Sequence, residues 1–467
     1  MVWGGNDNAV EKWIDQLLTN DPKLVSLHIL SFRQVSSAQL AAIFSALAQN
    51  TTLKELYCSG HALDADAVEQ LAEALTLNDT LQILNIGDAN FGTADDGKLV
   101  RILSEGLAVN EGLVTLDLEN KGLTKESASH IFRALSANNT LTSLSLARNN
   151  LTSLPDCSEL TLNSLRELNL AMNNIDAAGA RNIAAQLPRL ALEHLNVSDN
   201  PLLDGANAIG EALRENTTLR ILKLSNVAAV EEVLELPPTA TTPTGQLQEI
   251  APKIDEEQQT ENGNALMRTL AQSLRCNSTI QQLWLDSNGI DVRGLAELGQ
   301  LENSALVELR LRNNRIDDDG AIALAANFKS LRTIELGENT IGPIGLGALL
   351  ETSFEYVGLF SNKVGGFGAS LDLLPTLETS GVVTLDMGCN GMKVEDLEAM
   401  VQILQQGGVP KLKLLEIGGN AQDRDMEAWE QLVAQLESIR PQLRVAWKRS
   451  MSQMPTENPP PLNGPVI

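Results

Sequence analysis

LTSLSLARNNL, at residues 141–151, is the stretch of sequence that decides the fold. Leu144 and Leu146 alternate with small residues, which is the period of two expected for a short β-strand. Successive strand side chains point to opposite faces, so the two leucines point inward and the residues beside them point outward. Asn149 follows where the strand ends, and its amide can hydrogen-bond backbone groups in the turn.

The same phrase, L-x-x-L-x-L-x-x-N-x-L, recurs along nearly the whole chain, and such self-similarity indicates a repeat architecture. The copies begin at Leu24, Leu53, Leu81, Leu113, Leu141, Leu165, Leu192, Leu219, Ile280, Leu306, Leu331, Phe354, Val382 and Leu412. These fourteen copies begin mostly 23 to 32 residues apart, with one gap of 61. Asparagine ends the strand in nine of them, and Phe32, His61, Ala89, Lys121 and Val227 replace it in the others.

Amphipathic stretches lie between the predicted strands. In 320–328 and 394–406, apolar residues recur at the i, i+3, i+4 spacing of a helix. A strand and a helix in every repeat predict an α/β solenoid, bent into a horseshoe with parallel strands on the concave face and helices on the convex face. A second phrase, N-x-T/S-L, precedes several repeats. Its asparagine fits a helix end, where Asn tolerates the left-handed conformation.

These repeats resemble the leucine-rich repeat family, in particular the long-repeat type found in ribonuclease inhibitor, NOD-like receptors, Ran GTPase-activating proteins, tropomodulins and flagellar scaffold proteins. The resemblance covers about nine-tenths of the chain. It implies the solenoid fold, a cytoplasmic location and binding to other proteins. It does not select one function, because the fold serves many.

The domain organisation follows from the repeats. Residues 1–23 are predicted to form an N-terminal helical cap, with Val10, Trp13, Ile14, Leu17 and Leu18 on one face. The solenoid of about fourteen repeats spans 24–447. An acidic, Pro- and Thr-rich insertion at 228–263 interrupts it, and 448–467 form a Pro-rich, extended tail. Within the insertion, 230–236 alternates and could form a hairpin strand.

Charge narrows the class of partner. The 467 residues include 60 acidic and 34 basic side chains, which gives a net charge of −26. Such a chain is unsuited to the phosphate backbone of nucleic acid or to anionic lipid, and favours a basic protein partner. No apolar stretch reaches the roughly 18–20 residues of a membrane span. The four cysteines are far apart, so reduced thiols in the cytoplasm are expected.

Two short motifs point to ligands but fit poorly. GTADDGK, at 92–98, has the spacing of a phosphate-binding loop, yet Leu99 stands where a hydroxyl should hold magnesium. Asp317, Asp318 and Asp319 are similar to a calcium loop, but the spacing puts Arg315 at the first ligand position. An acidic first helical turn explains the run better. We expect no catalytic, cofactor or metal site, and no small-molecule substrate.

The outward positions of the strands form the predicted working surface. Aromatic and arginine side chains, which dominate interface hot spots, occupy several of these positions in a chain with only 3% aromatic residues. The predicted protein-binding residues are Trp284, Arg310, Arg312, Tyr356, Phe360 and Tyr57. Gly337, Gly388 and Gly358 flank Phe360 and are expected to leave room for a partner group, with Glu308, Glu335 and Asp386 nearby. The alternative is that these side chains are merely exposed, or that Trp284 stacks on Arg310.

The leading hypothesis is a non-enzymatic scaffold for protein–protein interaction. The resemblance adds membership of a large cytoskeletal or ciliary assembly. The alternative is a regulator of an enzyme, either a small-GTPase activator similar to Ran GTPase-activating proteins or a stoichiometric inhibitor of a basic enzyme. The GTPase activators typically carry a dense acidic tail, whereas 448–467 contain a single acidic residue, Glu457.

Overall fold

The fold is described from a computed structural model of the chain. It describes residues 7–157, 160, 162–229, 231–232, 253–296, 305–368, 377–420 and 425–447. The chain divides into two compact units. The first comprises Met1–Ile290 with Leu301–Leu306, and the second comprises Asp291–Gln300 with Val307–Ile467.

The first unit is built on nine parallel strands that pair in chain order. They are β1 (Ser26–His28), β2 (Glu55–Ser59), β3 (Ile83–Gly87), β4 (Thr115–Asp117), β5 (Ser143–Ser145), β6 (Glu167–Asn169), β7 (His194–Asn196), β8 (Ile221–Lys223) and β11 (Gln282–Trp284). The central leucine of each strand pairs with that of the next, as Leu116 does with Leu144. Both leucines are buried, so the predicted inward positions are confirmed.

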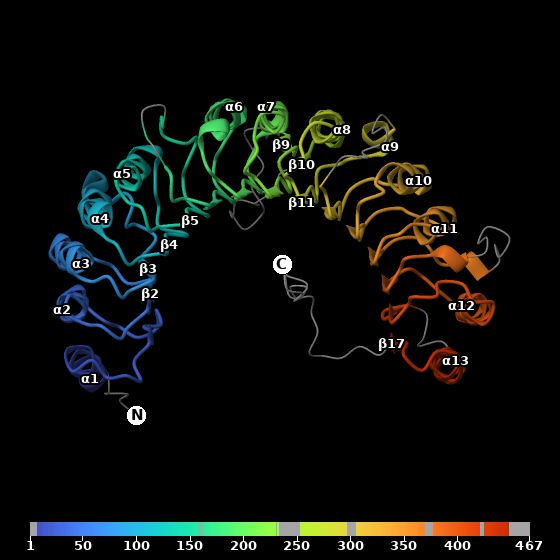
Figure 1. Ribbon diagram of the computed structural model, residues 1–467, viewed down its shortest axis with the longest axis horizontal. Helices are drawn as coiled ribbons and strands as arrows, with labels where there is room; N and C mark the ends of the chain where they lie inside the picture. Colours follow the sequence, from blue (N-terminus) through green and yellow to red (C-terminus); the bar gives the residue numbers. More distant parts are fainter. Residues whose placement is uncertain are drawn as a thin grey trace, which may run out of the picture. The chain divides into compact units, whose positions relative to one another are not determined.

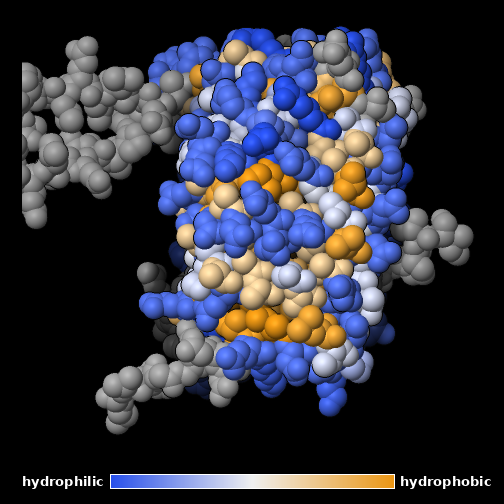
Figure 2. All heavy atoms as spheres, turned by 90° about the vertical axis from the view of Figure 1, so that its left-hand side faces the viewer, coloured by the Kyte–Doolittle hydropathy of each residue, from blue (hydrophilic) through white to orange (hydrophobic). Residues whose placement is uncertain are grey.

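The helices of the first unit lie on the outer side of its curve, and the strands lie on the inner side (Figure 1). They are α1 (Asp7–Leu18), α2 (Ser37–Leu47), α3 (Ala65–Leu77), α4 (Lys98–Val109), α5 (Lys125–Leu135), α6 (Ala177–Gln186), α7 (Ala206–Ala212) and α8 (Glu256–Leu274). In α1, Val10 and Leu17 are buried, but Leu18 is 60% exposed because it ends the helix. Polar atoms cover most of the face that the first helices present, with apolar patches between them (Figure 2).

The second unit repeats this plan with six parallel strands. They are β12 (Glu308–Arg310), β13 (Thr333–Glu335), β14 (Tyr356–Gly358), β15 (Thr384–Asp386), β16 (Leu414–Glu416) and β17 (Arg444–Ala446). Its helices are α9 (Val292–Leu295), α10 (Asp318–Asn327), α11 (Pro343–Leu350), α12 (Val394–Gln405) and α13 (Met426–Ile439). In the last helix Trp429 is fully buried and stacks on Trp447, 6.4 Å away between ring centroids.

The region predicted as an insertion contains structure at both ends. β9 (Glu231–Glu232) pairs antiparallel with β10 (Lys253–Ile254), in a small sheet of their own. Helix α8 begins at Glu256, so 256–263 belong to a repeat helix although the prediction extended the insertion to 263. The sequence EEQQTENG gives no apolar pattern there, yet Thr260 and Gly263 are buried. Residues 233–252 and the predicted tail, 448–467, lie outside the described residues.

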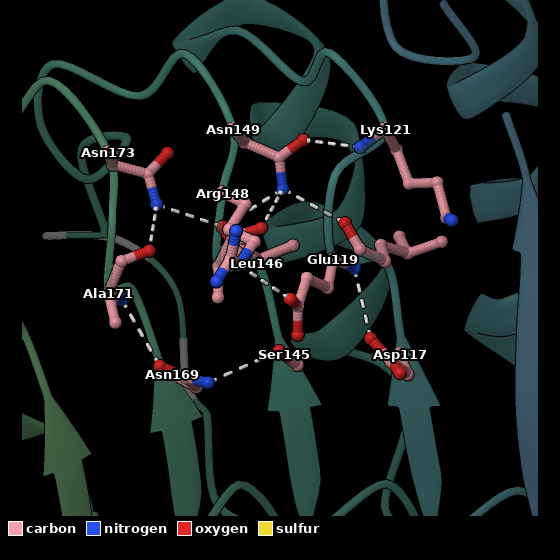
Figure 3. A network of polar contacts seen from close by, with 12 residues as sticks. Asp117, Glu119, Lys121, Ser145, Leu146, Arg148, Asn149, Asn169, Ala171 and Asn173 are labelled. Carbon is pink, nitrogen blue, oxygen red and sulfur yellow. Dashed lines mark hydrogen bonds and ion pairs between the residues drawn. The ribbon is translucent and has the colours of Figure 1, made fainter. Parts of the chain in front are cut away.

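The asparagines that end the strands bond backbone groups at the turns, as predicted, and most of them also bond the neighbouring repeat. Asn149 donates from its amide nitrogen to the carbonyls of Leu118, Leu146 and Ala147, at 2.9 to 3.0 Å (Figure 3). Its amide oxygen accepts from the backbone N–H groups of Lys121 and Leu123. The other members of this strand-end ladder are Asn173, Asn200, Asn288, Asn314, Asn339, Asn362, Asn390 and Asn420.

A second asparagine ladder lies where the helices end and the strands begin. The amide nitrogen of Asn110 donates to the carbonyls of Leu75 and Asn78, and its oxygen accepts from Gly112 and Leu113. Asn50, Asn78, Asn138, Asn216 and Asn277 form the rest of this strand-start ladder. The predicted left-handed conformation is wrong, because none of the six has a positive φ. Asn78 and Asn110 instead have an extended backbone, and the amide of each of the six donates to a carbonyl of the preceding repeat.

Candidate functional site

The six predicted binding residues divide between the two units. Tyr57 and Trp284 lie in the first unit, on β2 and β11, with six strands between them. The structure therefore does not bring those two together. Arg310, on β12, and Tyr356, on β14, lie in the second unit, together with Arg312 and Phe360, which follow the same two strands.

Tyr57 stacks on a residue that the sequence did not single out as a partner. The rings of His28 and Tyr57 are 4.4 Å apart and inclined by 13°. The two residues are direct neighbours in the register of β1 and β2, so aligning the repeats would have predicted that they lie side by side. Partial burial, followed by the charges of Glu55 and Asp117, raises the pKa of Tyr57.

Trp284 has a cation against its ring. The ammonium of Lys223 lies 3.5 Å from the ring centroid. Lys223 is the register neighbour of Trp284 on β8. Cation–π contacts of this kind hold an aromatic ring in place. Within the first unit, Trp284 is therefore already packed against its own chain.

In the second unit Arg312 reaches across an intervening repeat to Phe360. Its guanidinium carbon lies 5.7 Å from the centroid of the Phe360 ring, and it forms a 2.6 Å ion pair with Glu338. Gly337 occupies the intervening position, and a β-carbon there would lie 3.6 Å from Cγ of Arg312. The arginine stem therefore passes within ordinary contact distance of this position.

The room predicted around Phe360 is largely filled by the chain itself, which corrects that expectation. A β-carbon on Gly388 would lie 3.0 Å from the Phe360 ring, and one on Gly358 would lie 2.4 Å from a carboxylate oxygen of Glu335. Gly418, one repeat further on, has more space around it among the described residues. Within that part of the chain, a β-carbon there would approach only the carbonyl oxygen of Trp447, at 3.7 Å.

Three carboxylates share one column of the second unit. Glu335, Asp386 and Glu416 occupy register positions on β13, β15 and β16, with Gly358 between the first two on β14. The sequence analysis did not include Glu416, although aligning the repeats places it in the same column as Asp386. The hydroxyl of Tyr356 donates to Glu335 at 3.1 Å.

Burial and like charge shift the pKa values of two groups in this column. Burial raises the pKa of Asp386 to about 6, and Glu416 and Glu335 add to the rise, while the backbone N–H of Gly388 and the charge of Arg312 oppose it. The pKa of Tyr356 is also raised, first by burial and then by the carboxylates of Glu335 and Asp386. We define the acidic column as Glu335, Asp386 and Glu416. It favours a positive charge placed beside it.

The two ligand-like motifs have structural roles. Residues 94–97 form a short 3₁₀ turn and α4 begins at Lys98, as the repeat register predicted for GTADDGK. Asp317 caps α10 by accepting from Gly320, and Asp318 accepts from the backbone N–H groups of Gly342 and Gly345 at the start of α11. Among the described residues, no group of three or more His, Cys, Asp or Glu side chains is placed to hold a metal ion.

Comparisons with known proteins agree with this repeat architecture. A family model described as leucine-rich repeat matches residues 137–154, 161–184 and 302–325. Ribonuclease inhibitor from Sus scrofa is 27% identical over 325 residues, which cover 66% of this chain and 68% of that protein. NACHT, LRR and PYD domains-containing protein 13 from Homo sapiens is 31% identical over 166 residues, which cover 34% of this chain and 15% of that protein.

Other matches are more distant. Protein CARMIL from Dictyostelium discoideum is 25% identical over 281 residues, which cover 56% of this chain and 25% of that protein. The chain thus spans only a quarter or less of two of these relatives. Among solved structures, an internalin from Listeria monocytogenes covers 94% of this chain at 16% identity, with 94% of its own length matched and a TM-score of 0.41. The Rad7 and Elc1 complex in yeast matches 94% of this chain and 92% of the matched chain at 15% identity, with a TM-score of 0.42.

Parallel strands, outer helices and ladder asparagines, repeated along both units, define a repeat solenoid. The chain carries leucine-rich repeats, which the family model matches in three segments, and it is similar to ribonuclease inhibitor over 325 residues. No helix among the described residues has the length and apolar character needed to cross a membrane.

Proposed function

We propose that the chain is a non-enzymatic scaffold that binds a protein partner through the concave face of its second unit. The observation that carries the proposal is the grouping there of Arg310, Arg312, Tyr356 and Phe360 with the acidic column on adjacent strands. Aromatic and arginine side chains held rigidly in this way are the usual anchors of interfaces. Tyr57 and Trp284 offer further contact points on the first unit.

The acidic column favours a basic group of the partner. The position at Gly418 lies beside Gly388, whose β-carbon would approach the Gly418 carbonyl to 3.2 Å. A lysine or arginine side chain entering there would approach Asp386 and Glu416. Its charge would offset the mutual repulsion that raises the pKa of Asp386. The net charge of −26 would also speed the approach of a basic partner.

A regulator of an enzyme is the second candidate, and the match to ribonuclease inhibitor favours it. In that case the partner is a basic enzyme bound one-to-one. Activation of a small GTPase, membership of a cytoskeletal or ciliary assembly, and a cytoplasmic location stay predictions from the resemblance. Two assays separate the enzyme regulators from the scaffold: inhibition of a basic ribonuclease, and acceleration of GTP hydrolysis by a small GTPase.

The proposal is tested by affinity purification from the native cell with wild-type and variant baits. Phe360→Ala and Tyr356→Phe are expected to lose a co-purifying protein that the wild type retains. Tyr356→Phe keeps the packed ring and removes only the hydroxyl bonded to Glu335, so its melting temperature should change little. The matched control is Phe32→Ala, because Phe32 is 77% exposed and lies in the first unit. Equal recovery with all four baits would contradict the proposal.

A further inference from the structure

One edge of the first unit carries exposed apolar side chains outside the concave face. Leu77 and Val109 are the last residues of α3 and α4, and they are 64% and 60% exposed. Val114, just before β4, is 40% exposed. Figure 2 shows apolar patches among the polar atoms on the side of the molecule that α1 to α4 form. Large apolar side chains that gather on one exposed edge suggest an interaction surface.

The strand-start ladder holds this edge rigidly. Asn110 donates to the carbonyls of Leu75 and Asn78, so the turn after α4 is bonded to the end of α3. The turns also touch, because a β-carbon on Gly112 would lie 2.4 Å from the carbonyl oxygen of Asp79. Packed helices lie about 8–10 Å apart, which sets the spacing between Leu77 and Val109. A partner would therefore meet a surface that needs little ordering.

Two of these apolar residues, Leu77 and Val109, each have an exposed acid two positions later. Asp79 follows Leu77, and Glu111 follows Val109, with a ladder asparagine between them in both cases. The flanking repeats lack the pair. They carry Gln49 and Thr51 on one side, and Ala137 and Asn139 on the other. The surface is thus confined to two repeats, and we call Leu77, Asp79, Val109, Glu111 and Val114 the helix-end rim.

We propose that the helix-end rim binds an amphipathic helix of a partner protein, with apolar side chains one heptad apart and lysine or arginine beside them. Seven residues of α-helix rise about 10.5 Å, close to the roughly 8–10 Å expected between two neighbouring packed helices. The basic residues of that helix would face Asp79 and Glu111. This surface is separate from the concave face, so the inference goes beyond the proposed scaffold site.

The test uses the full chain and a fluorescent 18-residue peptide of leucine and lysine, with leucines placed along one helical face. Fluorescence anisotropy at physiological salt should detect binding. Leu77→Ser combined with Val109→Ser should weaken it about tenfold or more, the loss expected when an apolar anchor is removed. Asp79→Asn with Glu111→Gln should weaken it several-fold and reduce its salt dependence. The matched control is Ile322→Ser with Ile344→Ser, at two exposed apolar positions of the second unit.

Peptide and surface controls separate this inference from general charge attraction. A scrambled peptide of the same composition, and one with glutamate in place of lysine, should bind at least tenfold more weakly. Tyr356→Phe should leave binding unchanged, so failure here and failure of the concave-face proposal are distinguishable. The inference is overturned if the designed peptide does not bind, if the scrambled peptide binds equally well, or if the rim variants bind like the wild type while circular dichroism shows them folded.

Discussion

The first repeats of the first unit and the repeats of the second unit are held together at opposite edges of their strands. The repeats that begin at Leu53, Leu81 and Leu113 have strand-start asparagines, but His61, Ala89 and Lys121 stand where a strand-end asparagine is expected. In the second unit, strand-end asparagines follow β12 to β16. Where a strand-start asparagine would fall, its described residues are Phe328, Glu351, Thr379 and Val409.

This difference indicates that a buried amide at either end of the strand can connect a repeat to its neighbour. The backbone groups at these turns have no partner in a strand or helix ladder and would be costly to bury unpaired. The alternation L-x-L is kept in both units because only the strand can bury the leucines. The asparagine is kept only where the turn requires it.

The largest effect is expected from Asn110→Ala in the first unit. The change leaves the carbonyls of Leu75 and Asn78 and the N–H groups of Gly112 and Leu113 without their partner. The free energy of unfolding should fall by about 3 to 5 kcal/mol, since each buried polar group left unpaired costs about 1 kcal/mol or more. Urea denaturation measures it. Asn139→Ala, at an exposed neighbour, is the control and should change stability by less than about 0.5 kcal/mol. A loss below 1 kcal/mol for Asn110→Ala would argue against the strand-start ladder.

Asn339→Ala should have the next largest effect, in the second unit. It removes donation to the carbonyls of Leu311, Leu336 and Gly337, and leaves the N–H of Ile316 unpaired. A loss of about 2 to 3 kcal/mol is expected. Hydrogen exchange should rise in α10 and α11, whereas Asn110→Ala should raise exchange in α3 to α5, because a solenoid repeat contacts only its neighbours. Equal acceleration throughout both units would contradict this separation.

Much of this could be predicted from the sequence, because the repeat fixes the direction of each side chain. The strands, the outward positions and the strand-end ladder follow from the period of two and the recurring asparagine. The contacts of the outward side chains do not follow from the repeat pattern, because they depend on how far each side chain extends across the neighbouring strands. Arg312 passes over Gly337 to Phe360, and only the packed structure shows that the apparent gap is filled. The strand-start ladder was not predicted, because an asparagine at a helix end fits a left-handed cap equally well.

Asp386 should give a smaller, pH-dependent effect that belongs to the second unit alone. Its pKa in the folded protein is raised to about 6, above the roughly 3.9 of an unfolded chain. The folded state therefore holds its proton more tightly, and this residue lowers stability as pH rises from about 4 through 6. Asp386→Asn should stabilise the protein by about 1 to 2 kcal/mol at pH 8, and the gain should vanish near pH 4. Urea denaturation at both pH values measures it; a gain that does not depend on pH would refute this origin.

Lys121 gives the smallest expected effect and the finest test of how a repeat of the first unit dispenses with a strand-end asparagine. Its side chain is buried, and its ammonium donates to the hydroxyl of Ser59, two repeats earlier. Ala89, in the intervening repeat, has too short a side chain to occupy the same space. Burial lowers the pKa of Lys121, although the charges of Asp117, Asp88 and Glu119 oppose the shift.

Lys121→Met keeps the apolar stem and removes the charge, so stability at pH 7 should change by no more than about 1 kcal/mol. Because the folded pKa is depressed, the unfolded chain binds the extra proton, and the stability of the wild type relative to the variant should rise as pH approaches 10. Paired urea denaturations of the two proteins at pH 7 and pH 10 measure this. If the stability of the wild type relative to Lys121→Met fell between pH 7 and pH 10, the ammonium would be the stabilising element of this turn, and the stem alone would not replace the asparagine.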